Sequence, residues 1–412
     1  APESWRSRIL ELMGDPRPGV RLVAIEASSA WLLDAALGDR LERLARDGQS
    51  AVRERQLALL ALAEAADPRL QGLVPLFAAA REPRLRAVAA EVAALVGPAE
   101  VLTQLAVDRS PRVRRATLQG LLELAGDAAG PGDADEATSL ALASLEDGDV
   151  GVRSAALAWA AENPRIPGEA LVAALERARR DREDEALMAA IRALEARCQA
   201  VDAERTRGVA VLEELADSSR GGGGDFLVRR TAAEALVALG EPAPAQGPAR
   251  TGRSIESYRQ IALQTAGVRF FDLVLEQGIV RLALDCPEAP LHCLNFAQLA
   301  GQGFYDGLDF HRVVPDFVVQ GGDPRGDGLG GPGYSLRDEP NLLRYGPGVL
   351  GMARGAPDSA GSQFFITLSA QPHLEGAYTA FGRVVSGFEL LSSVVEGDRI
   401  LRVVPSSRGG ER

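Results

Sequence analysis

The chain has 412 residues, a globular composition, a formal net charge of -12 and a pI near 5.0. It is too long for one ordinary hydrophobic core, so two or three domains are predicted. The acidic balance argues against nucleic acid or an anionic membrane as the main partner, because both attract a basic surface. No run of the sequence approaches the roughly 18 apolar residues of a membrane span, so no transmembrane segment is predicted.

Residues 1–240 are predicted to form an all-α domain of repeated helical pairs. Residues 1–254 hold five aromatic residues and residues 255–412 hold fifteen, and the first part is rich in Ala and Leu at helical spacing. A motif recurs there: a turn with Asp, Glu, Gly or Pro, then an apolar residue followed by arginine, then an apolar helix. The arginines of this motif are separated by 32, 33, 28, 39 and 76 residues, and the last gap leaves room for an irregular repeat around Leu187-Met188. They are Arg21, Arg53, Arg86, Arg114, Arg153 and Arg229.

The clearest copy of the motif starts at Asp108. Asp108 or Ser110 can cap the helix, and Pro111 suits the first turn, where its missing N–H costs nothing. Val113, Leu118, Leu121 and Leu122 then fall near one face. This register resembles HEAT repeats, although the spacing is shorter than their usual range of about 40 to 47 residues.

A single helical pair cannot bury its apolar face, so the repeats are expected to stack into a HEAT-like solenoid. Such a solenoid presents an extended concave surface, and we predict a protein partner there. A spacer or packing shell without any ligand is the alternative. The arginines between Arg177 and Arg182 alternate with acidic residues, which favours a solvated helix face over a basic site.

Two segments interrupt the helical pattern. Ser218–Asp225, with four successive glycines, indicates a flexible loop, and residues 241–254 are rich in proline and glycine and are interpreted as the domain linker. A second domain is predicted over 255–405, opened by a short helix over 255–265, and residues 406–412 are expected to form a flexible tail.

The second domain has the pattern of an antiparallel β protein. Residues 270–276 and 279–285 alternate apolar and polar residues around Gln277-Gly278, which predicts a hairpin. Pro290 then opens a predicted helix that ends near Ala300. Further short strands separated by glycine loops are expected, followed by a helical run over 387–395 and a final strand near 400–404.

Two blocks of this domain carry a family resemblance. Residues 310–323 read FHRVVPDFVVQGGD and residues 352–366 read MARGAPDSAGSQFFI. Both blocks resemble the cyclophilin family of peptidyl-prolyl isomerases, and the resemblance covers roughly residues 268 to 404. It implies a closed eight-stranded antiparallel β-barrel with two capping helices. It also implies rotation about X-Pro bonds in proline-containing polypeptide clients, as a folding helper or chaperone.

The resemblance implies a set of site residues. Arg312 is the expected catalytic donor to the prolyl nitrogen, because its guanidinium stays charged and presents a rigid fork of N–H groups. Gln320 and Gln363 are expected to hold Arg312 and the substrate backbone. The residues expected to line the proline pocket are Phe317, Val318, Phe365 and Leu374. Ala353, Gly355 and the backbone of Arg354 should bind the residue before proline, with the Arg354 side chain pointing outward.

The chain departs from the family pattern in several places. His373 stands where many eukaryotic members have tryptophan, so cyclosporin sensitivity is not implied. Tyr378 occupies a position often held by histidine, which suggests the bacterial branch and keeps a donor at the pocket wall. The run 326–333 resembles the family's glycine-rich loop and lacks the accompaniments of a phosphate-binding motif.

The sequence gives no metal or cofactor signal. His292, His311 and His373 are the only histidines and are too dispersed for a zinc site; His311 is expected to be a buried structural residue. Three cysteines occur, so no dense disulfide framework is predicted. Cys286 and Cys293 are interpreted as two core thiols, with a disulfide in an oxidising compartment as the open alternative.

Two functional hypotheses remain open from the sequence. One is an active prolyl isomerase with a helical-repeat arm, and the other is a proline-binding scaffold in which turnover is incidental. The first residue is Ala1, which suggests removal of an upstream segment. A signal or lipoprotein segment upstream would place the protein in a bacterial envelope or periplasm, and its absence would place the protein in the cytoplasm.

Overall fold

The structure is a computed structural model that describes residues 3–31, 35–96, 99–127, 131–181, 183–217, 226–245, 254–265, 269–355 and 357–406. The chain divides into two compact units near residue 251, apart from residues 14–23, which group with the second unit. We call them the helical unit and the β unit, and we describe the helix over 18–28, which these bounds divide, with the helical unit. The predicted loop at 218–225, most of the predicted linker at 241–254 and nearly all of the predicted tail lie outside the described residues.

The helical unit is built from α-helices and one short 3-10 helix, η1 (Ser29–Trp31). Its α-helices are α1 (Glu3–Leu12), α2 (Pro18–Ser28), α3 (Ala35–Arg46), α4 (Val52–Glu64), α5 (Leu70–Ala78), α6 (Pro83–Val96), α7 (Ala99–Leu105), α8 (Pro111–Asp127), α9 (Pro131–Ser144), α10 (Val150–Glu162), α11 (Gly168–Asp181), α12 (Asp184–Ala200), α13 (Asp202–Ala216) and α14 (Phe226–Ala238).

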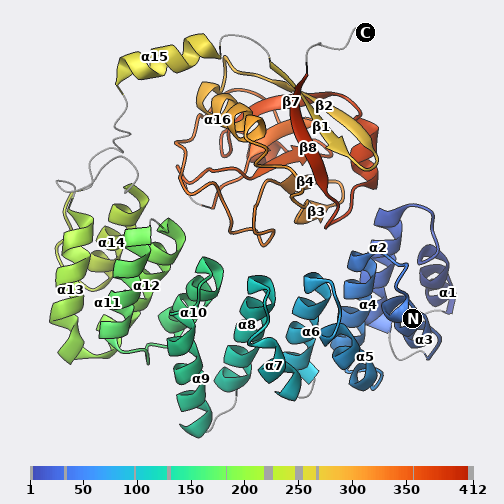
Figure 1. Cartoon of the computed structure of the whole chain (residues 1–412), viewed down its shortest axis with the longest axis horizontal. Helices are drawn as coiled ribbons and strands as arrows, with labels where there is room; N and C mark the ends of the chain where they lie inside the picture. Colours follow the sequence, from blue (N-terminus) through green and yellow to red (C-terminus); the bar gives the residue numbers. More distant parts are fainter. Residues whose placement is uncertain are drawn as a thin grey trace. The chain divides into compact units, whose positions relative to one another are not determined.

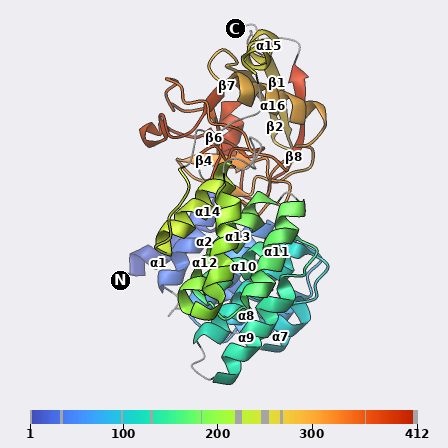
Figure 2. The same cartoon turned by 90° about the vertical axis from the view of Figure 1, so that its left-hand side faces the viewer.

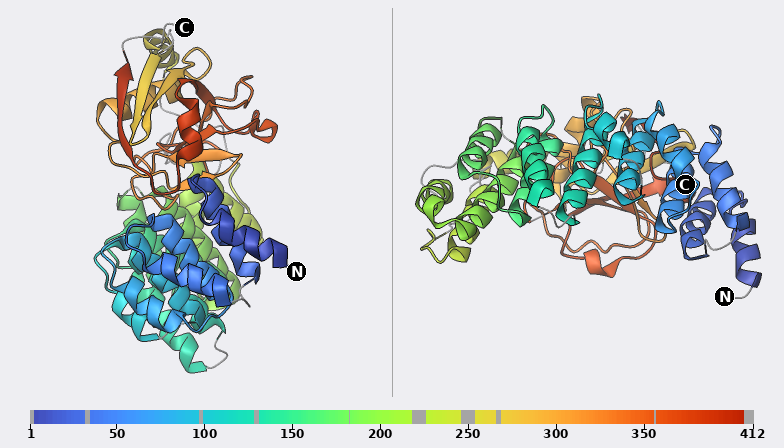
Figure 3. Two further views of the ribbon diagram at one scale, coloured as in Figure 1. Left: turned by 90° about the vertical axis from the view of Figure 1, so that its right-hand side faces the viewer. Right: turned by 90° about the horizontal axis from the view of Figure 1, so that it is seen from below.

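From α3 to α14 these helices form antiparallel pairs stacked in sequence order. Each odd-numbered helix packs on the even-numbered helix that follows it, and successive even-numbered helices pack on one another from α4 to α14 (Figures 1 and 2). In Figure 3 the colour of the helices therefore changes in sequence order, from blue at α1 to green at α14, along the line of stacked pairs. The buried faces are lined mainly by alanine and leucine, which lets neighbouring helices approach closely. Gly120 of α8 shows this, because a Cβ there would lie 2.6 Å from the Cβ of Ala94 in α6.

The repeated arginine fixes the turn before an even-numbered helix. Arg21, Arg86 and Arg114 each donate from Nη1 to the carbonyl oxygens six and five residues earlier, and Arg153 donates to the carbonyl six residues earlier. Since these carbonyls lie in a turn, outside the hydrogen-bond pattern of the helices, the guanidinium supplies them with a donor.

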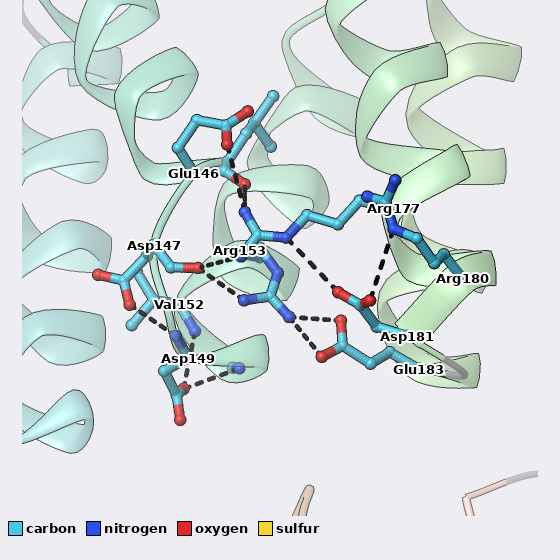
Figure 4. Close-up of polar contacts among 11 residues, drawn as sticks. Glu146, Asp147, Asp149, Val152, Arg153, Arg177, Arg180, Asp181 and Glu183 are labelled. Carbon is cyan, nitrogen blue, oxygen red and sulfur yellow. Dashed lines mark hydrogen bonds and ion pairs between the residues drawn. The ribbon is translucent and has the colours of Figure 1, made fainter.

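The same arginines connect one pair to the next. Arg86 contacts the carboxylate of Asp108 at 2.7 Å, and Arg114 contacts that of Asp147 at 2.8 Å. Arg153 reaches Glu183 in the same way, as Figure 4 shows. At these three positions the motif therefore links one helical pair to the next through an arginine–carboxylate contact. We call this series of contacts the arginine ladder.

The predicted solvated face near Arg177 is part of this ladder. Arg177 contacts the carboxylate of Glu146 at 3.3 Å and donates to the carbonyls of Leu145 and Asp147 (Figure 4). Arg180 instead is exposed and faces Asp181 at 3.7 Å. The cluster thus mixes a structural arginine with solvated ones, and each described arginine of the run has an acidic neighbour.

The β unit contains the helices α15 (Ile255–Gln264) and α16 (Pro290–Gly301) and eight strands. These strands are β1 (Arg269–Leu275), β2 (Gly278–Leu284), β3 (Arg312–Val314), β4 (Val318–Gly321), β5 (Val349–Met352), β6 (Phe364–Thr367), β7 (Ala380–Ser386) and β8 (Ile400–Ser406). They form one antiparallel sheet in the order β3-β4-β6-β5-β7-β2-β1-β8. The predicted hairpin is confirmed, with Leu275 opposite Gly278.

The sheet curls, and the segments before its two end strands meet at an antiparallel bridge between Asp309 and Arg399. Its inner face holds an aromatic core in which the fully buried Phe296 of α16 contacts Phe271, Tyr305, Phe364 and Phe381. The predicted helix from Pro290 is confirmed as α16, which packs on β8. Its first turn is capped by Glu339, whose carboxylate accepts from the backbone N–H groups of Leu291 and His292.

The second predicted helix, over 387–395, is shorter and tighter than expected. It is the 3-10 helix η4 (Phe388–Ser393), with hydrogen bonds from Leu390 to Gly387 and from Val394 to Leu391. Gly387 before it has φ +78°, and a Cβ there would meet the Ile279 carbonyl oxygen at 2.4 Å. The segment is therefore bound to the β1–β2 hairpin, which leaves no room for a longer α-helix.

Candidate functional site

Arg312 begins β3 and lies beside Phe317. Its exposed guanidinium carbon is 5.4 Å from the centre of the Phe317 ring, which stands in the turn between β3 and β4. A guanidinium at this distance is attracted by the ring face. In the ladder of β3 and β4, Arg312 lies opposite Gln320. The structure thus brings the three predicted catalytic residues together on one two-stranded ribbon.

The two predicted glutamines bond to each other. The Gln320 amide donates to the Gln363 side-chain oxygen at 3.0 Å, and the Gln363 amide donates to the carbonyls of Gly328 and Gly330 at 2.9 and 2.8 Å. The donors of this chain of hydrogen bonds therefore all point from Gln320 through Gln363 to the glycine-rich loop. This assignment of the amide groups leaves the Gln320 oxygen available to accept from a neighbour.

Asp323 shapes the glycine-rich loop from inside. Its carboxylate is almost fully buried and accepts from the backbone N–H groups of Arg325, Asp327 and Gly328. A Cβ at Gly330 would lie only 2.0 Å from the same carboxylate, so this position requires glycine. The loop supports Gln363 through the carbonyls of Gly328 and Gly330.

The alternation of the strands sorts the apolar residues into two layers. In β4, Val319 joins the barrel core whereas Val318 faces the other side; in β6, Phe364 joins the core whereas Phe365 does not. Val318, Phe365 and Leu374 belong to a second apolar cluster, which Phe317, Ala353 and Tyr378 flank. The structure therefore gathers all four predicted pocket residues on the outer face of the sheet, over β4 and β6.

His373 covers one edge of this cluster. Its ring is exposed and stacks on Phe317 with centroids 5.6 Å apart and an angle of 25°. Leu374 follows in the 3-10 helix η3 (Pro372–Leu374) and is buried. The Phe317 ring thus contacts both the His373 ring and the Arg312 guanidinium, and these two contacts orient the Phe317 ring.

Tyr378 and the end of β5 form the opposite edge. Tyr378 meets Phe365 edge-on at 5.8 Å, and Ala353 donates its backbone N–H to the Gln363 carbonyl at 2.9 Å. Gly355 is exposed, and a Cβ there would have no heavy atom within 4 Å. Of residues 353–355, Gly355 is therefore the exposed one, and Ala353 and Arg354 are partly buried; Ala356 lies outside the described residues.

The prediction that the Arg354 side chain points outward is wrong. It is mostly buried, donates to the Ala377 carbonyl and pairs with Asp338 at 3.3 Å, while its guanidinium carbon lies 5.4 Å from the Tyr378 ring centre. The sequence offered no sign of this, because Asp338 and Ala377 are far from Arg354 along the chain.

Two further residues of the site were not predicted. Tyr345 stacks on Phe365 at 5.7 Å beneath the apolar cluster, and burial raises the pKa of its hydroxyl. Gly351 of β5 lies against both rings, because a Cβ there would be 2.3 Å from Phe365 and 2.7 Å from the Tyr345 hydroxyl oxygen. Its position in a short apolar strand could have suggested a close approach of this kind.

The remaining candidates have structural surroundings. His292 is buried with Nδ1 2.7 Å from the Glu339 carboxylate, and His311 is only partly buried. Cys286 and Cys293 are buried and are not joined by a disulfide. Within the described ranges, no cluster of three or more His, Cys, Asp or Glu side chains could hold a metal ion, and no helix is long and apolar enough to cross a membrane.

Comparison with known proteins shows which family the β unit is similar to. Residues 270–407 match the family described as cyclophilin type peptidyl-prolyl cis-trans isomerase. Peptidyl-prolyl cis-trans isomerase B of Bacillus subtilis is 51% identical over 128 residues, which are 30% of this chain and 90% of the relative. The mouse peptidyl-prolyl cis-trans isomerase-like 1 is 41% identical over 150 residues, 32% of this chain and 90% of that protein. A cyclophilin-type isomerase structure from Cryptosporidium parvum, at 32% identity, covers 35% of this chain and 100% of its own, with a TM-score of 0.33.

Proposed function

Because the chain belongs to the cyclophilin-type peptidyl-prolyl cis-trans isomerases, we propose that Arg312 and the apolar cluster beside it are its site of X-Pro rotation. The uncatalysed rotation has a barrier of about 18–20 kcal/mol because the amide bond has partial double-bond character. No covalent bond breaks, so neither a nucleophile nor a general base is needed. A roughly 10⁵-fold acceleration requires about 7 kcal/mol of transition-state stabilisation.

Arg312 supplies part of that stabilisation in this proposal. As the amide twists, its resonance is lost and the lone pair localises on the prolyl nitrogen, which becomes a hydrogen-bond acceptor. A guanidinium N–H then donates to that nitrogen more strongly in the twisted state than in the planar one, as transition-state stabilisation requires. The contact of Arg312 with the Phe317 ring at 5.4 Å, beside an otherwise apolar surface, is the observation that carries this role.

The other predicted residues bind and orient the peptide. Phe317, Val318, Phe365 and Leu374 form the apolar surface that receives the proline ring, with His373 and Tyr378 at its edges. Gln320 and Gln363, joined by their side chains, orient Arg312 and the substrate backbone. Ala353, Gly355 and the Arg354 backbone contact the residue before proline.

The test is an isomerisation assay on an X-Pro peptide, by protease coupling or by NMR exchange. Arg312→Ala is expected to lower kcat/KM by at least about a hundredfold, as removal of a charge-stabilising donor does in other enzymes. Arg402→Ala, which removes an exposed arginine from β8, should leave the rate unchanged. Equal rates for wild type and Arg312→Ala would refute the role of Arg312 and favour a scaffold that only binds proline segments.

We further propose that the helical unit is a HEAT-like arm that binds polypeptide clients or a partner protein, and that the two units together assist folding. The stacked pairs support this, because such arrays present long surfaces with few constraints on sequence. Deleting residues 1–240 should then slow the catalysed refolding of a proline-limited protein while the rate on a short peptide stays the same. Equal losses on both substrates would contradict a binding arm.

A further inference from the structure

Arg354 makes three different contacts with its guanidinium. Nε and Nη2 both donate to the Ala377 carbonyl, with Nε at 3.1 Å, and Nε lies 3.3 Å from the Asp338 carboxylate. The guanidinium carbon lies 5.4 Å from the Tyr378 ring centre. One edge of the Arg354 guanidinium is therefore bonded to the protein itself, and its plane lies near the Tyr378 ring.

These contacts join two sides of the proposed proline site. Arg354 stands between Ala353 and Gly355, and its partners Ala377 and Tyr378 belong to the turn that begins at Leu374. That turn is continuous, because the N–H groups of Ala377 and Tyr378 both donate to the Leu374 carbonyl, at 3.1 and 3.2 Å. A displacement of the Ala377 carbonyl would therefore also displace the buried Leu374.

The braced turn also holds an aromatic contact. Tyr378 meets Phe365 edge-on, and Phe365 is the central aromatic residue of the apolar cluster. Without Arg354, the Tyr378 ring would lose the contact on its guanidinium side, and the turn would lose the donors to Ala377. The wall formed by Leu374 and Tyr378 would then be free to move relative to Phe365.

We propose that Arg354 is a positioning residue of the isomerase site, whose side chain braces the turn 374–378 against Phe365 and does not contact the residue before proline. This inference rests on the proposed function of that site. The inference has a consequence for the substrate class. Asp338 neutralises the charge of Arg354, and the Cβ position of Gly355 has open space around it. Substrates with an acidic residue before proline are therefore not preferred over others.

Arginine is required for this brace because of its shape. A planar fork donates two N–H groups to one carbonyl while lying near a ring, whereas lysine is a compact charge on a flexible stem. A lysine at 354 would keep the charge near Asp338 but lose the paired donation to Ala377. The brace therefore predicts that Arg354→Lys resembles Arg354→Ala more than it resembles the wild type.

The experiment measures kcat/KM for three peptides that have Ala, Glu or Lys before proline. We expect Arg354→Ala to lower kcat/KM about tenfold on all three, since small misplacements of a site wall are costly. The ratios among the peptides should stay within about twofold of wild type, and Arg354→Lys should recover less than a third of the loss. Arg337→Ala is the matched control, because it removes an exposed positive charge next to Asp338 without touching the brace.

Three results would overturn the inference: no loss in Arg354→Ala, a loss confined to the Glu peptide, or full recovery in Arg354→Lys. Asp338→Asn is the second variant, should Arg354→Ala fail to fold; it should reduce all three rates about two- to threefold, and unequal losses would contradict the brace. If the wild type is inactive, the proposed function fails separately. Peptide affinity by NMR titration then decides the brace, which requires Arg354→Ala to weaken all three peptides by the same factor.

Discussion

The motif arginines of the helical unit and Arg312 of the β unit have different kinds of partner. In the helical unit these arginines are structural. Arg86, Arg114 and Arg153 each donate to turn carbonyls and pair with a carboxylate of the next repeat. In the β unit, Arg312 is exposed on a strand and lies against an aromatic ring. The difference teaches that the partners of an arginine, rather than its charge, separate a structural residue from a candidate for chemistry.

The units also differ in how their cores are built. The helical unit repeats small side chains along many helices, whereas the β unit concentrates aromatic rings around Phe296. The chromophores are divided as well, since Trp5, Trp31 and Trp159 all precede the β unit and the five tyrosines lie at 258 and beyond. Each unit can therefore be followed by its own optical signal.

The largest expected effect is in the aromatic core. Phe296→Ala removes a fully buried ring that contacts four others, so we expect a loss of about 3–5 kcal/mol in the free energy of unfolding of the β unit. Urea unfolding followed by near-ultraviolet tyrosine circular dichroism measures it. The tryptophan fluorescence transition should not move, and an equal shift of both signals would show that the two units unfold as one.

The next effect is on the ladder. Arg86→Ala removes a buried guanidinium that pairs with the partly buried Asp108 carboxylate and donates to two turn carbonyls, so a loss of about 2–3 kcal/mol is expected in the helical unit. Far-ultraviolet circular dichroism reports it. Arg8→Ala is the comparison, because its pair with Glu11 is exposed and should cost about 0.5 kcal/mol or less. Similar losses for both variants would mean that the ladder adds nothing beyond surface charge.

A smaller effect is expected at the floor of the proposed site. Gly351→Ala places a methyl group against Phe365 and Tyr345, so a loss of about 1–3 kcal/mol and a fall of about tenfold in kcat/KM are expected. Gly346→Ala, which has open space around its Cβ position, should change neither. Unchanged activity in Gly351→Ala would show that Phe365 can shift without affecting the site.

The smallest effect is the response to acid. The hydrogen bond from Arg114 holds the pKa of Asp147 below its usual value, so the folded pKa is lower than the unfolded one. Its contribution is present above about pH 4 and is lost as the pH falls through the folded pKa. We expect the helical signal to lose about 1 kcal/mol or less over this range because the pair is partly solvated. Asp147→Asn should flatten this dependence, and an unaltered acid profile in that variant would assign it to other groups.

Much of the architecture could be predicted from local patterns. Helical spacing and the recurring arginine predicted helical pairs, the alternation around Gln277-Gly278 predicted the first hairpin, and Pro290 marked the start of α16. The family resemblance named Phe317 and Gln320, which lie beside Arg312, and three residues that share one apolar cluster, Val318, Phe365 and Leu374. These patterns succeed because they depend on contacts between residues close in sequence, or on a long motif that carries its tertiary partners with it.

What the chain alone determined was the kind of each element and the identity of the residues around Arg312. Only the tertiary structure decided which way they face and what they bond: Arg354 folds onto Tyr378, Gln320 donates to Gln363, and Gly351 lies under Phe365. The reason is physical, since each of these contacts joins segments that are distant in the sequence and meet only when the strands have paired. A side chain's partners across the sheet are set by register and twist, and no local pattern in the sequence records them.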